Sequence, residues 1–276
     1  MKNQSLKKNI STHGDTPRHF ANPLATQLSG LNIEDLLKKL PTICKCPADL
    51  RIAKNGELAP AESFFNEALG KIEFDKVYEY YNSGFTLIVQ GLQSSMDSFK
   101  GKFISSFPET ENFNKFQINA YITPAGENGF PIHWDLHEAY LLQLEGEKSW
   151  TLWNAIDEKP FFSADIIGCQ SLLEDIERYT SPSLQLNLTA GEILYIPRGT
   201  LHKGTSSNHA SMHITIGCRP LNVLDALRAR YASRNGAHTL QNFLFSHMNR
   251  NSYLGDASYL EDLNFLITEF ETTYES

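Results

Sequence analysis

The segment Pro131-Ile-His-Trp-Asp-Leu-His-Glu138 carries side chains that commonly bind metal ions. Side chains on an extended strand alternate between two faces, so His133 and Asp135 project to the same side, about 6 to 7 Å apart along the strand. The imidazole and the carboxylate could therefore bind one ion. The alternative is a strand histidine that only forms hydrogen bonds, because the His-x-Asp tripeptide also arises by chance.

A third ligand candidate, His202, ends the segment Gly191-Glu-Ile-Leu-Tyr-Ile-Pro-Arg-Gly-Thr-Leu-His202. A strand is predicted to end at Pro197 and a glycine turn to follow at Gly199, so that His202 emerges from a different strand. Two imidazoles and one carboxylate suit iron(II), since three adjacent coordination positions stay open. A closed structural zinc site would use four protein ligands. In the alternative interpretation His202 only packs beneath the turn.

Short strands are predicted to position these residues. The candidate segments are β-branched or alternate polar with apolar residues, and turn residues separate them. One turn, Glu145-Gly-Glu-Lys148, indicates a hairpin between the two strands that flank it. Short strands with no regular helix between them favour an antiparallel barrel or sandwich. The predicted strands are Phe85–Gln90, Phe116–Thr123, Glu138–Leu144, Ser149–Trp153, Leu184–Leu188, Glu192–Ile196 and Ala210–Gly217.

Apolar residues at helical spacing mark both flanks of the strand region. On the N-terminal side, helices are predicted at Leu31–Leu40, which Pro41 ends, and at Pro60–Leu69 and Glu73–Asn82. On the C-terminal side, they are predicted at Val223–Arg228 and Tyr259–Phe270. The predicted organisation is a polar arm at 1–30, a helical cover at 31–84, a barrel at 85–219 and C-terminal helices at 220–276.

The composition fits a folded domain and disfavours several classes of protein. Hydrophobic residues make up 41% of the 276 residues and charged residues 20%, the balance of a chain with an ordinary core. There is no apolar run of about 18 residues and no secretory segment, so we expect a cytoplasmic protein without membrane contact. The net charge of −8 disfavours direct nucleic-acid binding. The 4 cysteines are too few for a disulfide scaffold.

Two sets of residues carry a resemblance to a known family. The spacing of the second cupin motif is matched by Gly191, Pro197, Gly199 and His202. His133-Trp-Asp135, with Leu141-Leu-Gln-Leu-Glu-Gly-Glu-Lys-Ser-Trp150, resembles the JmjC-type oxygenases, most of all the ribosomal oxygenase branch, which hydroxylates protein side chains. The resemblance covers roughly Phe85 to Arg219. It implies a mainly β fold with a double-stranded β-helix (cupin or jelly-roll) core, N-terminal helices and a C-terminal helical segment.

The resemblance also implies roles for individual residues. His133, Asp135 and His202 would bind iron(II), and Lys148 would pair with the distal carboxylate of 2-oxoglutarate. A partly buried ammonium is costly unless a carboxylate meets it, which agrees with this role for Lys148. The alternative is a solvated lysine in the turn.

Other polar residues are weaker candidates. Asn119 and Tyr121 share a strand face and match positions that line the pocket in the ribosomal oxygenase branch, where they would bind cosubstrate or target; otherwise they are ordinary polar strand residues. Thr215 shares a face with His213 and is a candidate for a cosubstrate contact. His137 departs from the pattern, because the branch more often has an apolar residue there, and it is a candidate for touching metal or substrate.

The function that the resemblance implies is that of an iron(II)- and 2-oxoglutarate-dependent hydroxylase that consumes O2 and acts on a side chain of a protein or peptide. The alternatives are a small-molecule 2-oxoglutarate hydroxylase and a non-catalytic cupin-like binding protein. The C-terminal helices would form a homodimer interface or cover the barrel edge. The stretch after Arg219 is too short for helices plus the winged-helix module of the ribosomal enzymes, which argues against a ribosomal substrate.

Overall fold

The computed structural model describes residues 16–21, 31–95, 115–155 and 170–219. All of these residues belong to the first of two compact units, Met1–Pro220. The predicted C-terminal helices and most of the predicted polar arm lie outside the described residues. No helix in the described part of the chain is long and apolar enough to cross a membrane.

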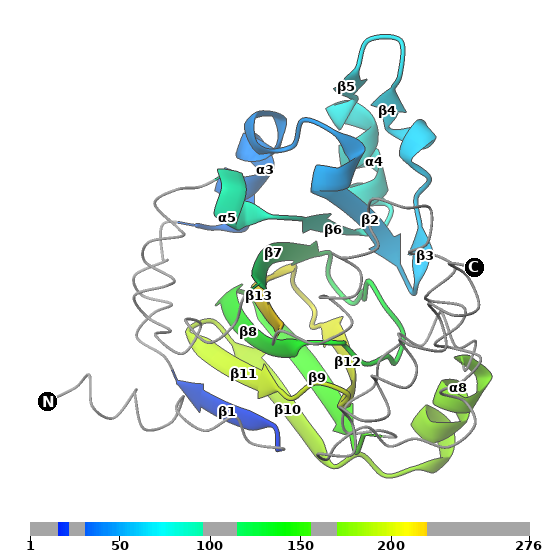
Figure 1. Cartoon of the computed structure of the whole chain (residues 1–276), viewed down its shortest axis with the longest axis vertical. Helices are drawn as coiled ribbons and strands as arrows, with labels where there is room; N and C mark the ends of the chain where they lie inside the picture. Colours follow the sequence, from blue (N-terminus) through cyan, green and yellow to red (C-terminus); the bar gives the residue numbers. More distant parts are fainter. Residues whose placement is uncertain (1–15, 22–30, 96–114, 156–169, 220–276) are drawn as a thin grey trace, which may run out of the picture. The chain divides into compact units, whose positions relative to one another are not determined.

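Two antiparallel sheets form the core of this unit (Figure 1). The larger sheet has the strand order β1 (Arg18–Ala21), β11 (Glu192–Ile196), β8 (Glu138–Glu145), β13 (Ser211–Arg219), β7 (Lys115–Thr123), β6 (Thr86–Val89), β2 (Leu50–Lys54) and β3 (Glu57–Leu58). The smaller sheet has the order β10 (Leu184–Thr189), β9 (Glu147–Trp153) and β12 (Leu201–Ser206), and a single bridge between His133 and His202 extends it. Strands β4 (Phe65–Asn66) and β5 (Lys71–Ile72) form a separate hairpin.

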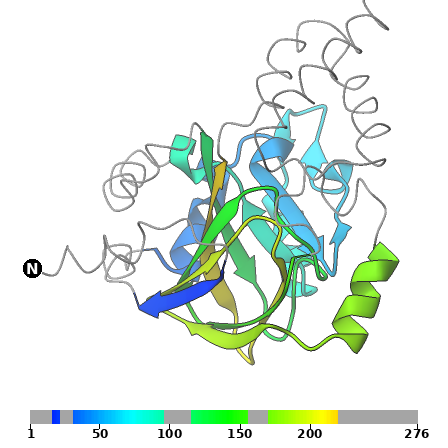
Figure 2. The same ribbon diagram turned by 60° about the horizontal axis from the view of Figure 1, so that its bottom comes forward.

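From β7 onward the chain alternates between the two sheets, except that the consecutive strands β9 and β10 both lie in the smaller one. Strands β7, β8, β11 and β13 lie in the larger sheet, whereas the His133 bridge, β9, β10 and β12 lie in the smaller one. Figure 2 shows the two sheets curving around a common interior. This alternation is the arrangement of a double-stranded β-helix, so the predicted fold class is confirmed.

The predicted hairpin at Glu145-Gly-Glu-Lys148 is wrong. Strand β8 pairs with β11 and β13, while β9 pairs with β10 and β12, so the turn carries the chain from one sheet to the other. Gly146 sits at this corner with φ of 67°, and a Cβ there would overlap the carbonyl oxygen of Ala210. The glycine therefore serves a close crossing of backbones rather than a hairpin turn.

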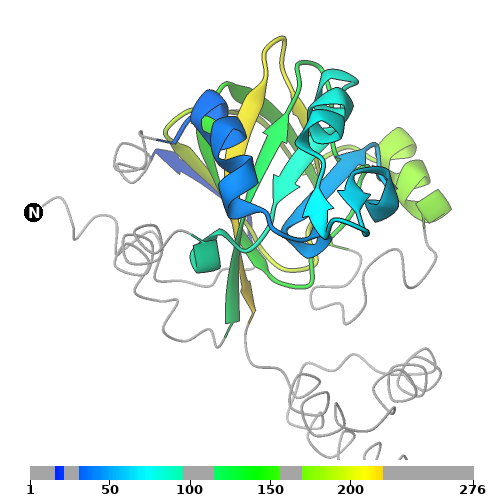
Figure 3. The ribbon, with the colours of Figure 1, turned by 90° about the horizontal axis from the view of Figure 1, so that it is seen from above.

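Helices cover the outer face of the larger sheet, as Figure 3 shows from above. Helix α3 (Ile33–Ile43) begins at Asn32, whose side chain caps the Asp35 N–H, and it continues through Pro41 although an end was predicted there. Proline lacks the N–H that would bond Leu37, and the Leu37 carbonyl instead accepts a 3.0 Å hydrogen bond from the Tyr78 hydroxyl. Helix α4 (Phe74–Asn82) agrees with the prediction.

Two further predictions of helical structure are wrong. Residues 60–69 form a 3₁₀ turn at Ala61–Ser63 and strand β4, because the chain reverses at Gly70 and buries Phe64 in the core. Helix α8 (Gln170–Tyr179) lies between strands, where no helix was predicted. The helix is amphipathic: Leu173 is fully buried against Trp134 and Leu201 among others, and Ile176 is partly buried against the same cluster.

Strand β1 lies within the stretch predicted as a polar arm. It pairs with the outer edge of β11, and the His19 imidazole lies 3.2 Å from the Glu192 carboxylate. Phe20 packs against the core. Backbone hydrogen bonds to the open edge of the sheet stabilise this strand. Because the strand is short and has no long apolar pattern, it was not predicted from the sequence.

The central strands of the larger sheet are buried on both faces, and alternation along each strand divides its side chains between the helical cover and the barrel interior. Even-numbered residues of β13, such as Ile214, pack outward in a cluster with Leu36, Leu40 and Val77 of the helices. Odd-numbered residues of β13, His213 and Thr215, line a cavity between the two sheets. The interior face of the barrel is therefore where polar side chains collect.

Candidate active site

His133 and His202 face each other across the β-bridge that extends the smaller sheet. Their backbones exchange two hydrogen bonds, of 3.1 Å from His133 N and 2.8 Å from His202 N, and their ring centroids lie 4.3 Å apart. Asp135 follows two residues after His133, and its Oδ2 lies 3.7 Å from His202 Nε2. One ligand atom from each of the three residues lies within 4.8 Å of the others. The three predicted metal ligands are therefore brought together.

Both imidazoles are oriented by the same local contact. The Nδ1 atom of His133 lies 2.8 Å from the carbonyl oxygen of Pro131, and that of His202 lies 2.9 Å from the carbonyl oxygen of Thr200. A carbonyl oxygen only accepts, so each Nδ1 carries the hydrogen and each Nε2 keeps its lone pair for a ligand bond. Burial, with the nearby His133, lowers the pKa of His202 to about 4, which keeps this imidazole neutral.

The donor set fits iron(II). Two imidazole nitrogens and one carboxylate supply three ligands, and among the described residues no fourth His, Cys, Asp or Glu joins the group. A site of this kind leaves coordination positions open for oxygen ligands, whereas structural zinc is closed by four protein ligands.

The turn that leads to His202 is fastened to the Asp135 segment. Gly199, with φ of 82°, donates its N–H to the carbonyl oxygen of Asp135 at 3.1 Å. The carboxylate of Glu138 accepts the hydroxyl of Tyr195 at 2.5 Å and the backbone N–H of Arg198 at 3.3 Å. Burial and the hydrogen bond to Glu138 raise the pKa of the Tyr195 hydroxyl.

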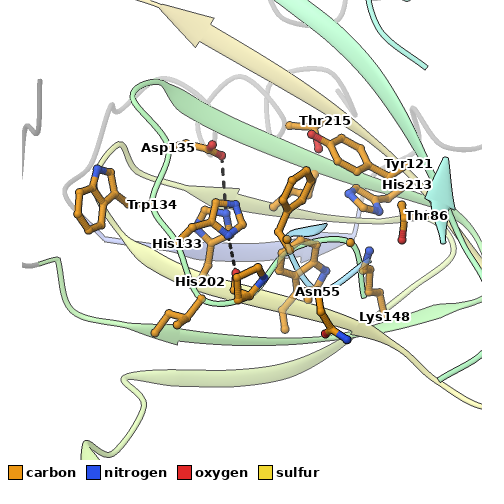
Figure 4. Close-up of a pocket in the computed structure, with 18 of the residues that line it drawn as sticks. Asn55, Thr86, Tyr121, His133, Trp134, Asp135, Lys148, His202, His213 and Thr215 are labelled. Carbon is orange, nitrogen blue, oxygen red and sulfur yellow. Dashed lines mark hydrogen bonds and ion pairs between the residues drawn. The ribbon is translucent and has the colours of Figure 1, made fainter. Parts of the chain in front are cut away.

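A cavity of about 580 Å³ extends from the three ligand candidates into the barrel. Figure 4 places Asp135, His133 and His202 together on one side of it and Lys148 on another, beside Thr86 and His213. Residues near the N-terminal helices and from α8 complete the lining, among them Arg51, Asn55, Leu58, Phe130, Gln170 and Glu174. The guanidinium of Arg51 lies over the Phe130 ring at 5.3 Å from its centroid.

Lys148 is buried in this cavity, with only 3% of its surface exposed. Its Nζ donates to the Thr123 hydroxyl at 3.1 Å and lies 5.5 Å from the centroid of the Trp150 ring. None of the ion pairs between described residues includes Lys148. Burial lowers the pKa of its ammonium to about 7. Because burying an unpaired charge is costly, an anionic ligand beside this ammonium would stabilise it.

The remaining candidates divide between the cavity and its surroundings. Tyr121 and Thr215 line the cavity. Burial and the charge of Asp135 raise the pKa of Tyr121 to about 12, so its hydroxyl stays protonated. Asn119 is not among the lining residues, and its side-chain oxygen accepts the Gly91 N–H at 3.1 Å. His137 also lies outside the lining; its Nε2 is 3.9 Å from the Asp135 carboxylate, and its ring packs over Gly217.

Sequence reasoning missed several residues that line the cavity. His213 and Thr86 were not candidates, although His213 shares its strand face with Thr215. The alternation along β13 was the one pattern that could have identified His213. Arg51 and Glu174 come from elements whose position against the barrel is set by tertiary packing, and no local pattern points to them.

Part of the chain resembles a known protein family. Residues 102–226 match the model of the JmjC domain. This part of the chain is therefore similar to JmjC domains. The match begins within the stretch predicted as the barrel and extends 7 residues past Arg219. The predicted resemblance to JmjC-type oxygenases is therefore confirmed.

Curated relatives of the JmjC domain include two groups of enzymes. The chain is 39% identical over 102 residues to the bifunctional lysine-specific demethylase and histidyl-hydroxylase NO66 of Caenorhabditis elegans. This aligned region covers 36% of this chain and 13% of that protein. It is 33% identical over 150 residues to ribosomal oxygenase 1 of Danio rerio. This aligned region covers 51% of this chain and 25% of that protein. The chain thus spans only a small part of the length of these relatives.

Solved structures of the ribosomal oxygenase YcfD from Escherichia coli also align with the chain. One is 16% identical and has a TM-score of 0.48, over 97% of this chain and 67% of that one. Another, 15% identical with a TM-score of 0.48, holds cobalt and 2-oxoglutarate.

Proposed function

We propose that this protein is an iron(II)- and 2-oxoglutarate-dependent dioxygenase that hydroxylates a side chain of a protein or peptide. One observation carries the proposal: a group of two histidines and one aspartate shares a cavity with a buried lysine that has no carboxylate partner. With iron(II), 2-oxoglutarate and O2 bound, such a site supplies oxidation of a C–H bond, with succinate and carbon dioxide as the other products.

The residues of this chain have separable tasks in the proposed reaction. His133, Asp135 and His202 hold the metal, and their backbone contacts fix the two nitrogens and the carboxylate relative to one another. Lys148 binds the distal carboxylate of 2-oxoglutarate. The negative charge of this carboxylate compensates the positive charge of the buried ammonium. The apolar rings of Trp150 and Phe130 line the cavity and limit access of water.

A protein substrate is favoured by three facts. The relatives of the JmjC domain carry the names histidyl-hydroxylase and ribosomal oxygenase. The chain has a net charge of −8, which favours a basic partner. Besides the barrel strands, the start of β2, the loop around Phe130 and helix α8 also contribute residues to the cavity lining. We therefore place peptides that contain histidine, with basic flanking residues, first among the substrates to test.

Several finer predictions stay proposals. They are the division into 1–30, 31–84, 85–219 and 220–276, the homodimer through the C-terminal helices, and the cytoplasmic location. The roles of Asn119, Tyr121 and Thr215 in binding the cosubstrate stay proposals as well. Tyr121 and Thr215 are supported by their place in the cavity lining.

The test is succinate release from 2-oxoglutarate under air with added iron(II), in the presence and absence of candidate peptides. We expect release from the parent protein, and loss of at least about 90% of it in His133→Ala and Lys148→Ala. His19→Ala and Lys203→Ala are matched controls, since both residues form ion pairs away from the cavity and should leave release unchanged. Absence of iron-dependent release in the parent, with no 2-oxoglutarate binding, would instead favour a cupin-like binding protein.

A further inference from the structure

His213 lies in the cavity wall next to Lys148, in a position that its neighbours fix closely. Only 2% of its surface is exposed. Its ring stacks on the ring of Tyr121, with centroids 4.7 Å apart and planes 11° apart, and meets Trp150 edge-on at 5.5 Å. Tyr121 is also its partner in the register between β7 and β13. Two aromatic contacts of this kind hold the imidazole in one orientation.

One polar atom of this imidazole, the buried Nδ1, lacks a hydrogen-bond partner among the described residues. Leaving a buried polar atom unpaired costs free energy, and native structures show few such atoms. A bound ligand that meets the imidazole would explain why the cavity retains it, because His213 also lines the space that the ligand would occupy.

The charge around His213 defines which ligand fits. The buried ammonium of Lys148 is the charged group that acts on it, and burial together with this charge holds the pKa of His213 well below its usual range. The imidazole is therefore neutral and keeps one N–H to donate. Thr86 lies beside Lys148 in the cavity wall, and its hydroxyl donates at 3.2 Å to the hydroxyl of Thr123, which also accepts the Lys148 ammonium.

We propose that His213 and Lys148 together bind one carboxylate group of the ligand, the ammonium meeting one oxygen and the His213 N–H the other. The proposal rests on the proposed function, in which that group is the distal carboxylate of 2-oxoglutarate. A carboxylate has two acceptor oxygens, and a single ammonium that already bonds Thr123 satisfies them incompletely. A neutral second donor completes the site without adding a second buried charge.

The test compares two ligands that differ only in the distal carboxylate. Binding of 2-oxoglutarate and of 2-oxopentanoate to the full-length, Mn(II)-loaded protein is measured by calorimetry without air. His213→Phe keeps an aromatic ring against Tyr121 and Trp150 but removes the N–H. We expect it to weaken 2-oxoglutarate binding by about 10- to 100-fold and to leave 2-oxopentanoate binding within about 3-fold, as for loss of one hydrogen bond to a charged group.

A second variant keeps the proposal testable where phenylalanine disturbs folding. His213→Gln retains an N–H donor and should bind 2-oxoglutarate at least about 5-fold more tightly than a His213→Leu variant, which has none. Equal losses for both ligands, or unchanged 2-oxoglutarate binding in His213→Phe, would assign His213 a packing role only and overturn the inference. A parent protein that binds Mn(II) but not 2-oxoglutarate would overturn the proposed function itself, and the carboxylate site with it.

Discussion

The carboxylate of Glu138 accepts a 2.5 Å hydrogen bond from the hydroxyl of Tyr195. Glu138 opens β8 three residues after Asp135, and Tyr195 lies near the end of β11, just before the turn that leads to His202. The same carboxylate accepts the N–H of Arg198 within that turn. One partly buried carboxylate thus joins the two chain segments that carry the proposed metal ligands.

Removing the Tyr195 hydroxyl should loosen this junction. We expect Tyr195→Phe to lower the free energy of unfolding by about 1 to 3 kcal/mol, because a hydrogen bond to a charged group is lost. The affinity for Mn(II) should fall as well, by about 3- to 10-fold, since the turn before His202 loses a tether. Urea unfolding and calorimetric Mn(II) titration give the two quantities. Tyr179→Phe is the control, because that side chain is 75% exposed, and equal behaviour of the two variants would show that the contact does not hold the site.

The buried Lys148 should make stability depend on pH. Its pKa is about 7 in the folded protein and near 10.5 in the unfolded chain, so the unfolded chain holds more protons between these values. Stability of the ligand-free protein therefore rises with pH across this window. Between pH 7 and pH 9 the parent should gain about 2 kcal/mol relative to Lys148→Met. Urea unfolding of both proteins at the two pH values measures this difference. A parent and a variant with the same pH dependence would mean that Lys148 is not buried as a lone ammonium.

Two glycines with similar backbone angles should respond differently to alanine. Gly146 and Gly126 have φ of 67° and 73°, so alanine at either position incurs the left-handed cost of about 1 to 2 kcal/mol. At Gly146 the new Cβ would also overlap the Ala210 carbonyl, whereas no atom lies within 4 Å of the new Cβ at Gly126. We expect Gly146→Ala to cost about 2 kcal/mol more than Gly126→Ala in urea unfolding. Similar losses would contradict the close crossing of β8 and β9 with the start of β13.

Local patterns predicted strands β6 to β11 and β13 and grouped His133 with Asp135 for a physical reason. Alternation along a strand is a local property, so it placed His133 with Asp135 and it separated the two faces of β13. Which sheet the next strand joins is not local, and the turn at Gly146 was therefore read as a hairpin. Helix α8 does carry a local signal, because Leu173 and Ile176 lie at helical spacing and pack against the same cluster, so this helix was missed although its sequence indicates it.

The side chains around the site were harder to predict than its backbone. Alternation placed Asn119 on the face of Tyr121, yet the Asn119 side chain bonds Gly91, which comes from a distant part of the chain. His213 gave no motif, because its partners Tyr121 and Trp150 meet it only once the barrel is formed. Contacts that depend on long-range sheet pairing leave no periodic trace in the sequence.

The central claim is that one cavity binds a metal through His133, Asp135 and His202 and a carboxylate through Lys148. The most direct measurement is 2-oxoglutarate affinity, by calorimetry without air, for the parent and Lys148→Met, each with and without Mn(II). We expect the parent to bind at least about 100-fold more tightly with Mn(II) than without, and Lys148→Met to lose at least about 10-fold of the Mn(II)-dependent affinity while it still binds Mn(II). Binding that is indifferent to the metal, or equal in the parent and Lys148→Met, would contradict the claim.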